Sequence, residues 1–300
     1  MAAKTKFKRF LAGTGIVVLI LVAAFAMIIP WIYTWGATPE ETAQTYRGDE
    51  ILSTPIIVWT HAITINAPSA RVWPWIIQMG DGRAGFYSYT FIENMVSGSN
   101  AYHNASQVVA DWQNPSAGQV IITPMLAIKD YKAGEWELAS SVIPDLGWTW
   151  MWQLTPLGTQ GDQTRLQVRM RIQVPAGAAS GTVVKNILHV GGFVMERAMM
   201  TGIKAHAEGR LPFAGSQVVE IVVWVLALGI GLASAWLFIF RPAWKLPLAV
   251  GILAVLALFV FTFLQPGIWL RMVVDLALIA GLDMGRRINR KRPAALPVKV

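Results

Sequence analysis

The chain has 300 residues, of which 54% are hydrophobic and only 14% are charged, whereas a soluble domain carries about 25% charged residues. This composition excludes a disordered chain, a coiled coil and a typical cytosolic enzyme. The sequence contains no cysteine, which excludes disulfides, thiolate metal sites and cysteine nucleophiles. The formal net charge of +8 would suit an acidic partner such as nucleic acid, so its distribution along the chain matters.

The positive charge lies outside the middle of the chain. Residues 40–210 contain 12 Lys and Arg against 14 Asp and Glu, a net charge of −2, and the remaining residues contain 13 against 3, a net charge of +10. Basic residues that flank apolar segments are explained by the orientation of a membrane protein. We therefore expect the lipid bilayer as a partner, and no nucleic acid.

An N-terminal anchor is predicted in residues 1–37. Residues 10–35 carry no charge, which is enough to cross a hydrocarbon core of about 30 Å. The preceding lysines resemble the start of a signal peptide, and residues 24–26 offer a small-residue cleavage pattern. The apolar run continues past that point through Trp31, so we interpret it as a retained anchor with Trp31, Tyr33 and Trp35 at the membrane interface.

Three further apolar segments follow in residues 216–285. Residues 221–240 and 246–264 are uncharged, whereas residues 268–285 are a weaker candidate because they contain Arg271, Asp275 and Asp283. Arg271 and Asp275 are four residues apart and can pair on one helix face, and Arg271, near one end of the segment, could instead extend its charge to the membrane interface. The alternative is an ion or proton pathway through the membrane. We predict about four transmembrane helices, and residues 286–300 form a basic cytoplasmic tail.

The basic residues also predict the orientation. With four spans, the N-terminal lysines, the loop with Arg241 and Lys245, and the basic tail all lie on one side of the membrane, and this side is expected to be cytoplasmic. The protein would then belong to the plasma (inner) membrane of a prokaryote, with both termini cytoplasmic. Ala227, Gly231 and Ala235 form a small-residue ridge that suits close packing, either within the chain or with another membrane subunit.

The folded domain is predicted in residues 38–215. Residues 57–65 alternate as a strand. Residues 66–69 break this strand and could start a short helix that contains residues 72–77, a second short helix is expected in residues 88–96, and several strand patterns follow. Alternation in residues 148–155 and 165–174 indicates an antiparallel sheet with one apolar and one wet face. The alternation in residues 135–140 places Trp136 and Leu138 on one face of the strand and Glu135 and Glu137 on the other. A long helix over residues 182–208 must cover the sheet, so the fold class is α+β.

Several separated strings in this region resemble one known superfamily. They are residues 62–68 (AITINAP), 72–80 (VWPWIIQMG), 82–89 (GRAGFYSY) with Glu93 and Asn94, and 193–197 (FVMER) followed by Gly202, Ile203, Lys204, Ala207 and Glu208. The order and the strings resemble the SRPBCC superfamily, the START-like helix-grip domains that include polyketide cyclase/dehydrase-like proteins. The resemblance covers about residues 55–209. It implies a helix-grip domain, an antiparallel sheet wrapped on a long C-terminal helix, which encloses an apolar cavity.

The first group of candidate site residues is apolar. Tryptophan carries an N–H that needs a partner, so several in one dry core are less usual than Leu or Val. Together with the resemblance, this favours a ligand cavity over simple core packing. The candidate wall residues are Trp73, Trp75, Trp148, Trp150, Trp152, Met170, Phe193 and Met195.

The second group is polar and surrounds the second short helix. Arg83, Tyr87, Tyr89, Glu93 and Asn94 could bind a ligand head group or transfer protons, but we slightly prefer a structural ion pair between Arg83 and Glu93. His61, on the apolar strand face, is interpreted as a satisfied core histidine, with a polar contact in the cavity as the alternative.

Motifs for metals and cofactors are weak. Residues 80–85 (GDGRAG) match the dinucleotide fingerprint, but the flanking elements are not a strand and a helix of a parallel fold. We interpret this segment as a loop whose glycines adopt positive φ. The other histidines lack metal-ligand spacing. We therefore expect no metal and no cofactor.

These observations lead to one leading hypothesis. The chain is expected to bind a hydrophobic ligand (a lipid, quinone or isoprenoid) at the extracytoplasmic membrane face. One alternative is a cyclase/dehydrase-like enzyme that uses Tyr87, Glu93 or His61 for acid–base chemistry. The other is an accessory subunit of a larger membrane complex, suggested by the small-residue ridge. The sequence contains no defined catalytic constellation, so we favour binding over catalysis.

Overall fold

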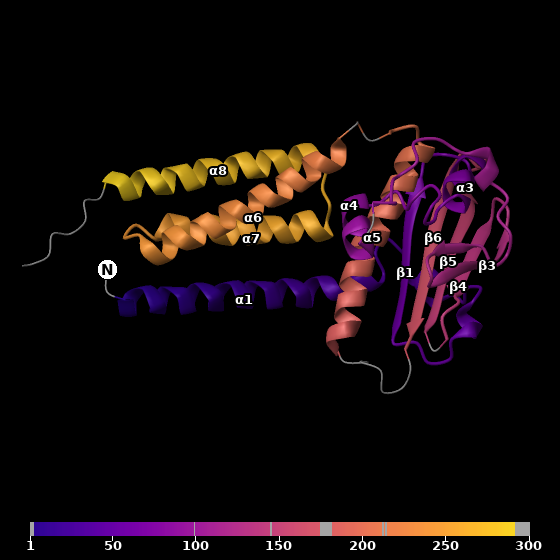
Figure 1. Ribbon diagram of the computed structural model, residues 1–300, viewed down its shortest axis with the longest axis horizontal. Coiled ribbons are helices and arrows are strands. Elements are labelled where there is room, and N and C mark those ends of the chain that lie inside the picture. Colours follow the sequence, from indigo (N-terminus) through magenta and orange to yellow (C-terminus); the bar gives the residue numbers. More distant parts are fainter. Residues whose placement is uncertain are drawn as a thin grey trace, which may run out of the picture. The chain divides into compact units, whose positions relative to one another are not determined.

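The computed structural model describes residues 3–98, 100–144, 146–174, 182–211, 213 and 215–291 (Figure 1). The chain divides into two compact units. The helical unit consists of Met1–Met27 and Ala214–Val300, and the sheet unit consists of Ile28–Phe213. Each unit has its own hydrophobic core.

The helical unit contains most of α1 (Ala3–Tyr33), α6 (Ser216–Phe240), α7 (Lys245–Phe263) and α8 (Ile268–Lys291). Helices α1, α6 and α7 are long and apolar enough to cross a membrane. This confirms the first three predicted segments as membrane-length helices. Helix α8 has 24 residues, but its charged residues keep it outside that group.

Helices α6, α7 and α8 pack against one another through a shared apolar core. The small-residue ridge belongs to this packing. Ala227 and Ala254 are fully buried, and a Cβ atom added to Gly231 would lie 3.5 Å from the Cβ atom of Ala254. Ala227 and Gly231 of the ridge therefore pack within the chain, whereas Ala235 is exposed.

The charges at the start of α8 do not pair as predicted. Nη1 of Arg271 lies 3.5 Å from Oε1 of Glu220 in α6, and Nε donates a hydrogen bond of 2.7 Å to the carbonyl oxygen of Pro266. Asp275 is buried, and its carboxylate oxygens have no hydrogen-bond partner among the described residues. The expected Arg271–Asp275 pair was wrong because Glu220, which is distant in sequence, supplies the partner of Arg271.

The sheet unit is an α+β structure with one six-stranded antiparallel sheet, in the order β1-β6-β5-β4-β3-β2. The predicted strands and helices are confirmed. Its elements are α2 (Pro39–Ala43), η1 (Asp49–Ile51), β1 (Ile57–Ile65), α3 (Ser69–Ile77), α4 (Thr90–Ser97), η2 (Ala110–Trp112), β2 (Val120–Ile122), β3 (Leu126–Lys132), β4 (Trp136–Ser141), β5 (Gly147–Leu157), β6 (Gln163–Gln173) and α5 (Thr182–Ala207).

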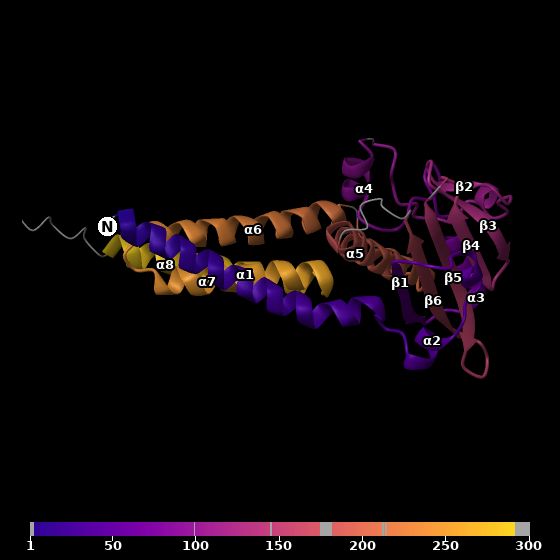
Figure 2. The same ribbon diagram turned by 90° about the horizontal axis from the view of Figure 1, so that it is seen from below.

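One face of the sheet, here called the inner face, packs against α3 and α5. Figure 2 shows α5 beside β1. Trp150, Trp152 and Leu154 of β5 lie in this core together with Met200 and Ile203 of α5. The long helix therefore covers the sheet, as expected. The wrapped helix-grip arrangement itself remains a prediction.

The polar side chains of the opposite, outer face are less exposed to solvent than the alternation suggested. Arg165 of β6 lies 2.7 Å from a carboxylate oxygen of Glu41, and Arg169 and Arg171 each lie 3.3 Å from Asp49. The segment between α1 and β1 supplies these acidic partners. The outward arginines are thus held in ion pairs, and a small apolar cluster lies on the same face: Tyr46, Leu138 and Met151.

Glycines have structural roles at two places in the sheet unit. Gly80, Gly82 and Gly85 have positive φ in the loop between α3 and α4, which confirms the loop interpretation of the GDGRAG string. A Cβ atom added to Gly192 in α5 would lie 2.9 Å from the ring of Trp59. The glycine at position 192 therefore allows Trp59 of β1 to approach the helix closely.

Candidate functional site

Three tryptophans of β5 form a ladder on the inner face. Trp148, Trp150 and Trp152 alternate along the strand and so share one face. The ring centroids are 6.3 Å apart for Trp148 and Trp150 and 5.0 Å apart for Trp150 and Trp152. Trp150 and Trp152 are buried, and Trp148 is partly buried against the same core. The three rungs differ in what their indole N–H groups meet.

The central rung belongs to a buried polar network around Glu196 of α5. Nε1 of Trp150 donates to Oε2 of Glu196 at 2.8 Å, and Nε1 of Trp59 donates to Oε1 at 3.0 Å. Nδ1 of His61 also lies 2.5 Å from Oε1. Glu196 and His61 are 1% and 0% exposed. The network therefore ties β1, β5 and α5 together in the interior.

His61 extends this network to the end of α1. Its Nε2 lies 2.6 Å from the carbonyl oxygen of Ile32, which can only accept, so Nε2 carries a proton. Nδ1 of His61 faces Oε1 of Glu196 at 2.5 Å. Both ring nitrogens are engaged, and the geometry matches the interpretation of a satisfied core histidine.

His189 lies beside this network. Its ring centroid is 3.6 Å from that of Tyr33 and 5.8 Å from that of Trp59. Its Nε2 is buried without a hydrogen-bond partner among the described residues. Burial, and to a lesser extent the nearby His61 and Lys185, lowers the pKa of His189 to about 4, so this imidazole is neutral at physiological pH.

The indole N–H groups of Trp148 and Trp152, at the two ends of the ladder, have no such partners. Nε1 of Trp148 and Nε1 of Trp152 are buried and make no hydrogen bond to any described residue. Glu137 of β4 is the cross-strand neighbour of Trp152, is 2% exposed, and leaves its Oε2 without a partner in the same part of the chain. We call Glu137, Trp148 and Trp152 the unpartnered cluster.

Arg83 lies close enough to act on Glu137 electrostatically. Burial raises the pKa of Glu137 to about 8, and the positive charge of Arg83 opposes this shift. Nη2 of Arg83 donates to the carbonyl oxygens of Ile77 and Trp112, at 3.1 Å and 2.6 Å, and no ion pair of 4.0 Å or less joins it to Glu137 among the described residues. Glu137 is therefore largely protonated at neutral pH and can donate a hydrogen bond.

Tyr87 completes the polar groups on this side of the interior. Its hydroxyl oxygen accepts a hydrogen bond of 2.8 Å from Nε2 of Gln78, and its burial raises the pKa of the phenol. A Cβ atom added to Gly202 of α5 would lie within 3 Å of Tyr87. The close approach of α5 thus fixes Tyr87 over the inner face.

The predicted ion pair between Arg83 and Glu93 is not formed. Arg83 is directed to backbone carbonyls, and both carboxylate oxygens of Glu93 are buried without a hydrogen-bond partner in the described part of the chain. Burial raises the pKa of Glu93 to about 7. Asn94 instead bonds the backbone of Tyr102, and Tyr89 stacks edge-on against Phe91.

The remaining candidates lie in or against the sheet-unit core. Trp75 packs between Tyr87 and His206, and Trp73 stacks on Tyr131. Phe193 contacts the rings of Trp31, Trp35 and His61. Met170 is buried opposite Trp150, and Met195 is partly buried. The predicted apolar wall is thus brought together, and its use as a ligand cavity remains a prediction.

Sequence reasoning missed Glu196 and Glu137 as site residues. Glu196 lies within the FVMER string, but no sequence pattern shows that Trp59, His61 and Trp150 converge on it. The alternation in β4 did separate Glu137 from Leu138, and Ala139, two residues after Glu137, lies in the inner core. The small side chain of Ala139 was the available signal that this face is covered.

Comparison with known protein families and with curated proteins finds no match for this chain. The resemblance to the SRPBCC superfamily therefore stays a prediction from the quoted strings and the order of elements. No group of three His, Asp or Glu residues in the described parts of the chain is placed to hold a metal ion.

Proposed function

We propose that this protein binds a hydrophobic ligand of its own membrane inside the sheet unit. The observation that carries the proposal is the unpartnered cluster. Two indole N–H groups and one carboxyl oxygen are buried in an aromatic interior without hydrogen-bond partners among the described residues. Leaving a buried polar group unpaired costs about 1–3 kcal/mol, so a ligand that pairs with these groups would gain that free energy.

The chemistry of the cluster narrows the ligand class. Trp148 and Trp152 can only donate, and a protonated Glu137 can donate as well. An apolar molecule with carbonyl oxygens complements three donors. Among a lipid, a quinone and an isoprenoid, a quinone or a lipid ester meets this requirement better than a plain isoprenoid alcohol.

The setting of the domain supports a ligand taken from the bilayer. Helix α1 precedes the sheet unit and α6 follows it, and both are long and apolar enough to span. The proposal includes α8 as a fourth span, both termini in the cytoplasm, and the sheet unit as an extracytoplasmic helix-grip domain in a prokaryotic plasma membrane. An apolar ligand would then reach the domain without crossing much water.

The test is a ligand-dependent thermal shift of the full chain in mild detergent. A short-chain ubiquinone, farnesol and dioleoyl phosphatidylcholine are added separately. We expect ubiquinone or the phospholipid to raise the melting temperature. Trp152→Phe should abolish that rise, because phenylalanine keeps a smaller aromatic ring but lacks the indole N–H donor.

The matched control is Trp136→Phe. Trp136 also has a buried, unpartnered indole N–H in the described structure, but it packs beside Leu138 and Met151 on the outer face. This variant should keep the full thermal shift. The proposal fails if none of the three probes shifts the melting temperature, or if the two variants behave alike.

A further inference from the structure

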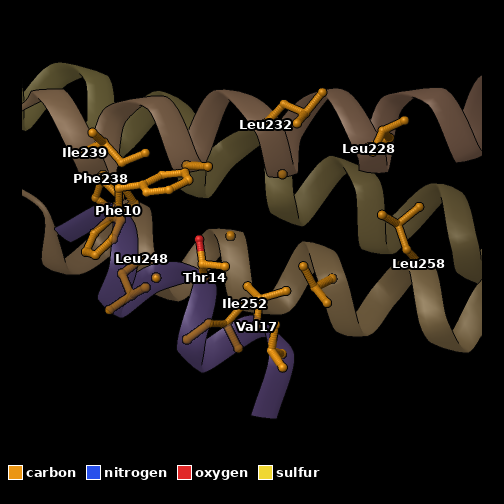
Figure 3. A pocket seen from close by; sticks show the side chains of 17 residues that line it. Phe10, Thr14, Val17, Leu228, Leu232, Phe238, Ile239, Leu248, Ile252 and Leu258 are labelled. Atoms are coloured by element: carbon orange, nitrogen blue, oxygen red, sulfur yellow. The ribbon is translucent and has the colours of Figure 1, made fainter. Parts of the chain in front are cut away.

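The helical unit contains an apolar cleft between α1, α6 and α7 (Figure 3). Its volume is about 310 Å³, at the lower end of the range of small-molecule sites, about 300–1,000 Å³. Of the side chains that line it, only that of Thr14 carries a polar atom. The lining includes Phe10 and Val17 of α1, Leu228 and Leu232 of α6, and Ile252 and Leu258 of α7.

Glycines of α6 and α7 border this cleft. Gly231 and Gly251 line it, and a Cβ atom at either position would meet its nearest described neighbour at 3.5 Å, an ordinary van der Waals distance. Neither glycine is therefore required for helix contact by itself. Gly231 borders the cleft, so we expect a leucine at this position to occupy part of its volume.

One end of the cleft carries a group of cations. Phe10 follows Arg9 in α1, Ile239 precedes Arg241 by two residues, and Pro247 follows Lys245 by two residues. None of these cations has a carboxylate within 4.0 Å among the described residues, whereas Arg287 of α8 is paired with Asp283 at 2.7 Å. The basic end thus has positive charge without acidic partners.

Arg9 is held in place at this end. Its Nη1 donates to the carbonyl oxygens of Arg241 and Phe238, at 2.7 Å and 3.3 Å, and its guanidinium lies 5.6 Å from the ring centre of Trp244. These bonds satisfy free carbonyls at the end of α6. They also fix a positive charge next to Phe10, at the mouth of the cleft.

We propose that the cleft is a binding site for an anionic phospholipid. One acyl chain occupies the apolar cleft, and the phosphate lies at the basic end beside Arg241 and Lys245. The positive charge of Arg9 also attracts the phosphate. Basic pockets between membrane helices bind anionic head groups in this way. The site is separate from the ligand site of the sheet unit, because every residue in it belongs to the helical unit.

The experiment is native mass spectrometry of the full chain released from nanodiscs that contain equal amounts of dioleoyl phosphatidylglycerol and dioleoyl phosphatidylcholine. We expect one retained lipid, enriched in phosphatidylglycerol. Each cation near the membrane surface contributes about fivefold in affinity for an anionic lipid. Arg241→Gln with Lys245→Gln should therefore reduce the enrichment by about tenfold or more.

Two matched controls separate the site from general effects. Arg286→Gln with Arg290→Gln removes the same charge from α8, outside the cleft lining, and should leave the enrichment unchanged. Gly231→Leu should abolish the retained lipid. Gly229→Leu should not, because a Cβ atom at Gly229 meets nothing within 4 Å and this residue does not line the cleft.

Three results would overturn the proposal: equal retention of the two lipids by the wild type, equal losses in the two charge variants, or equal losses in the two glycine variants. If Gly231→Leu lowers the melting temperature, the charge variants decide the outcome alone. If Trp152→Phe loses the rise in melting temperature with ubiquinone but retains phosphatidylglycerol, the two sites bind their ligands independently.

Discussion

Glu137 of β4 and Glu196 of α5 are both buried at the inner face of the sheet, and each lies next to a tryptophan of β5, yet their surroundings differ. Glu196 accepts from Trp59 and Trp150 and pairs with His61. Glu137 leaves one carboxyl oxygen without a described partner beside the free N–H of Trp152. A satisfied network holds a fold together, whereas unsatisfied groups carry a free-energy cost that a ligand can remove.

The largest effect is expected from breaking the satisfied network. Glu196→Ala leaves two indole N–H groups and His61 without their acceptor in a dry interior. Removing one partner of a buried pair costs about 3–5 kcal/mol, and chemical denaturation should show a loss of this size in the sheet unit. Glu135→Ala, at an exposed ion pair with Lys132, should change the free energy of unfolding by less than about 0.5 kcal/mol. A loss below about 1 kcal/mol for Glu196→Ala would show that the network adds little.

At Glu137, in contrast, we expect a substitution to increase the free energy of unfolding. Its pKa is raised to about 8, so the unfolded chain releases this proton near pH 4.5 and the folded chain does not. The Glu137 contribution therefore becomes increasingly unfavourable as the pH rises from about 4.5 to 8, by about 1.4 kcal/mol per pH unit. Glu137→Gln, measured without ligand, should be more stable than the wild type by roughly 3 kcal/mol at pH 7.

The same variant provides its own control through pH. Below about pH 4 the wild-type carboxyl is protonated in both states, so the gain from Glu137→Gln should shrink toward zero. A gain that is equal at pH 4 and pH 8, or a loss of stability at pH 7, would contradict the assignment of Glu137 as an unpaired buried carboxyl.

The contrast between the two glutamates also shows what sequence patterns can predict. Alternation in β5 and β6 correctly placed the tryptophan ladder and the outward arginines, because a half-buried strand has a strict period of two. The three apolar membrane-length helices were equally evident from long uncharged runs. These predictions depend only on residues that are close in sequence.

The rest depended on contacts between distant segments. The pairs Arg271–Glu220 and Arg165–Glu41 join residues that no local pattern connects, so the predicted Arg271–Asp275 and Arg83–Glu93 pairs were wrong. Convergence of His61, Trp150 and Glu196 requires the register of β1 and β5 against α5. The polar residues of a site are the hardest to place, because their partners come from different elements of the fold.

The smallest of the expected effects is the pH response of His189, which lies beside the satisfied network but takes no part in it. Its pKa falls from the usual 6.5 to about 4 on folding. As the pH falls, His189 is therefore protonated at a higher pH in the unfolded chain than in the folded chain. The free energy of unfolding then decreases as the pH falls from about 6.5 to 4, by roughly 2 kcal/mol at pH 5. His189→Phe should flatten the melting temperature between pH 7 and pH 5, and His103→Gln, at an exposed histidine, should not. If His189→Phe loses as much stability on acidification as the wild type, acid sensitivity arises in the Glu196 network itself, and the separation drawn between the two would not hold.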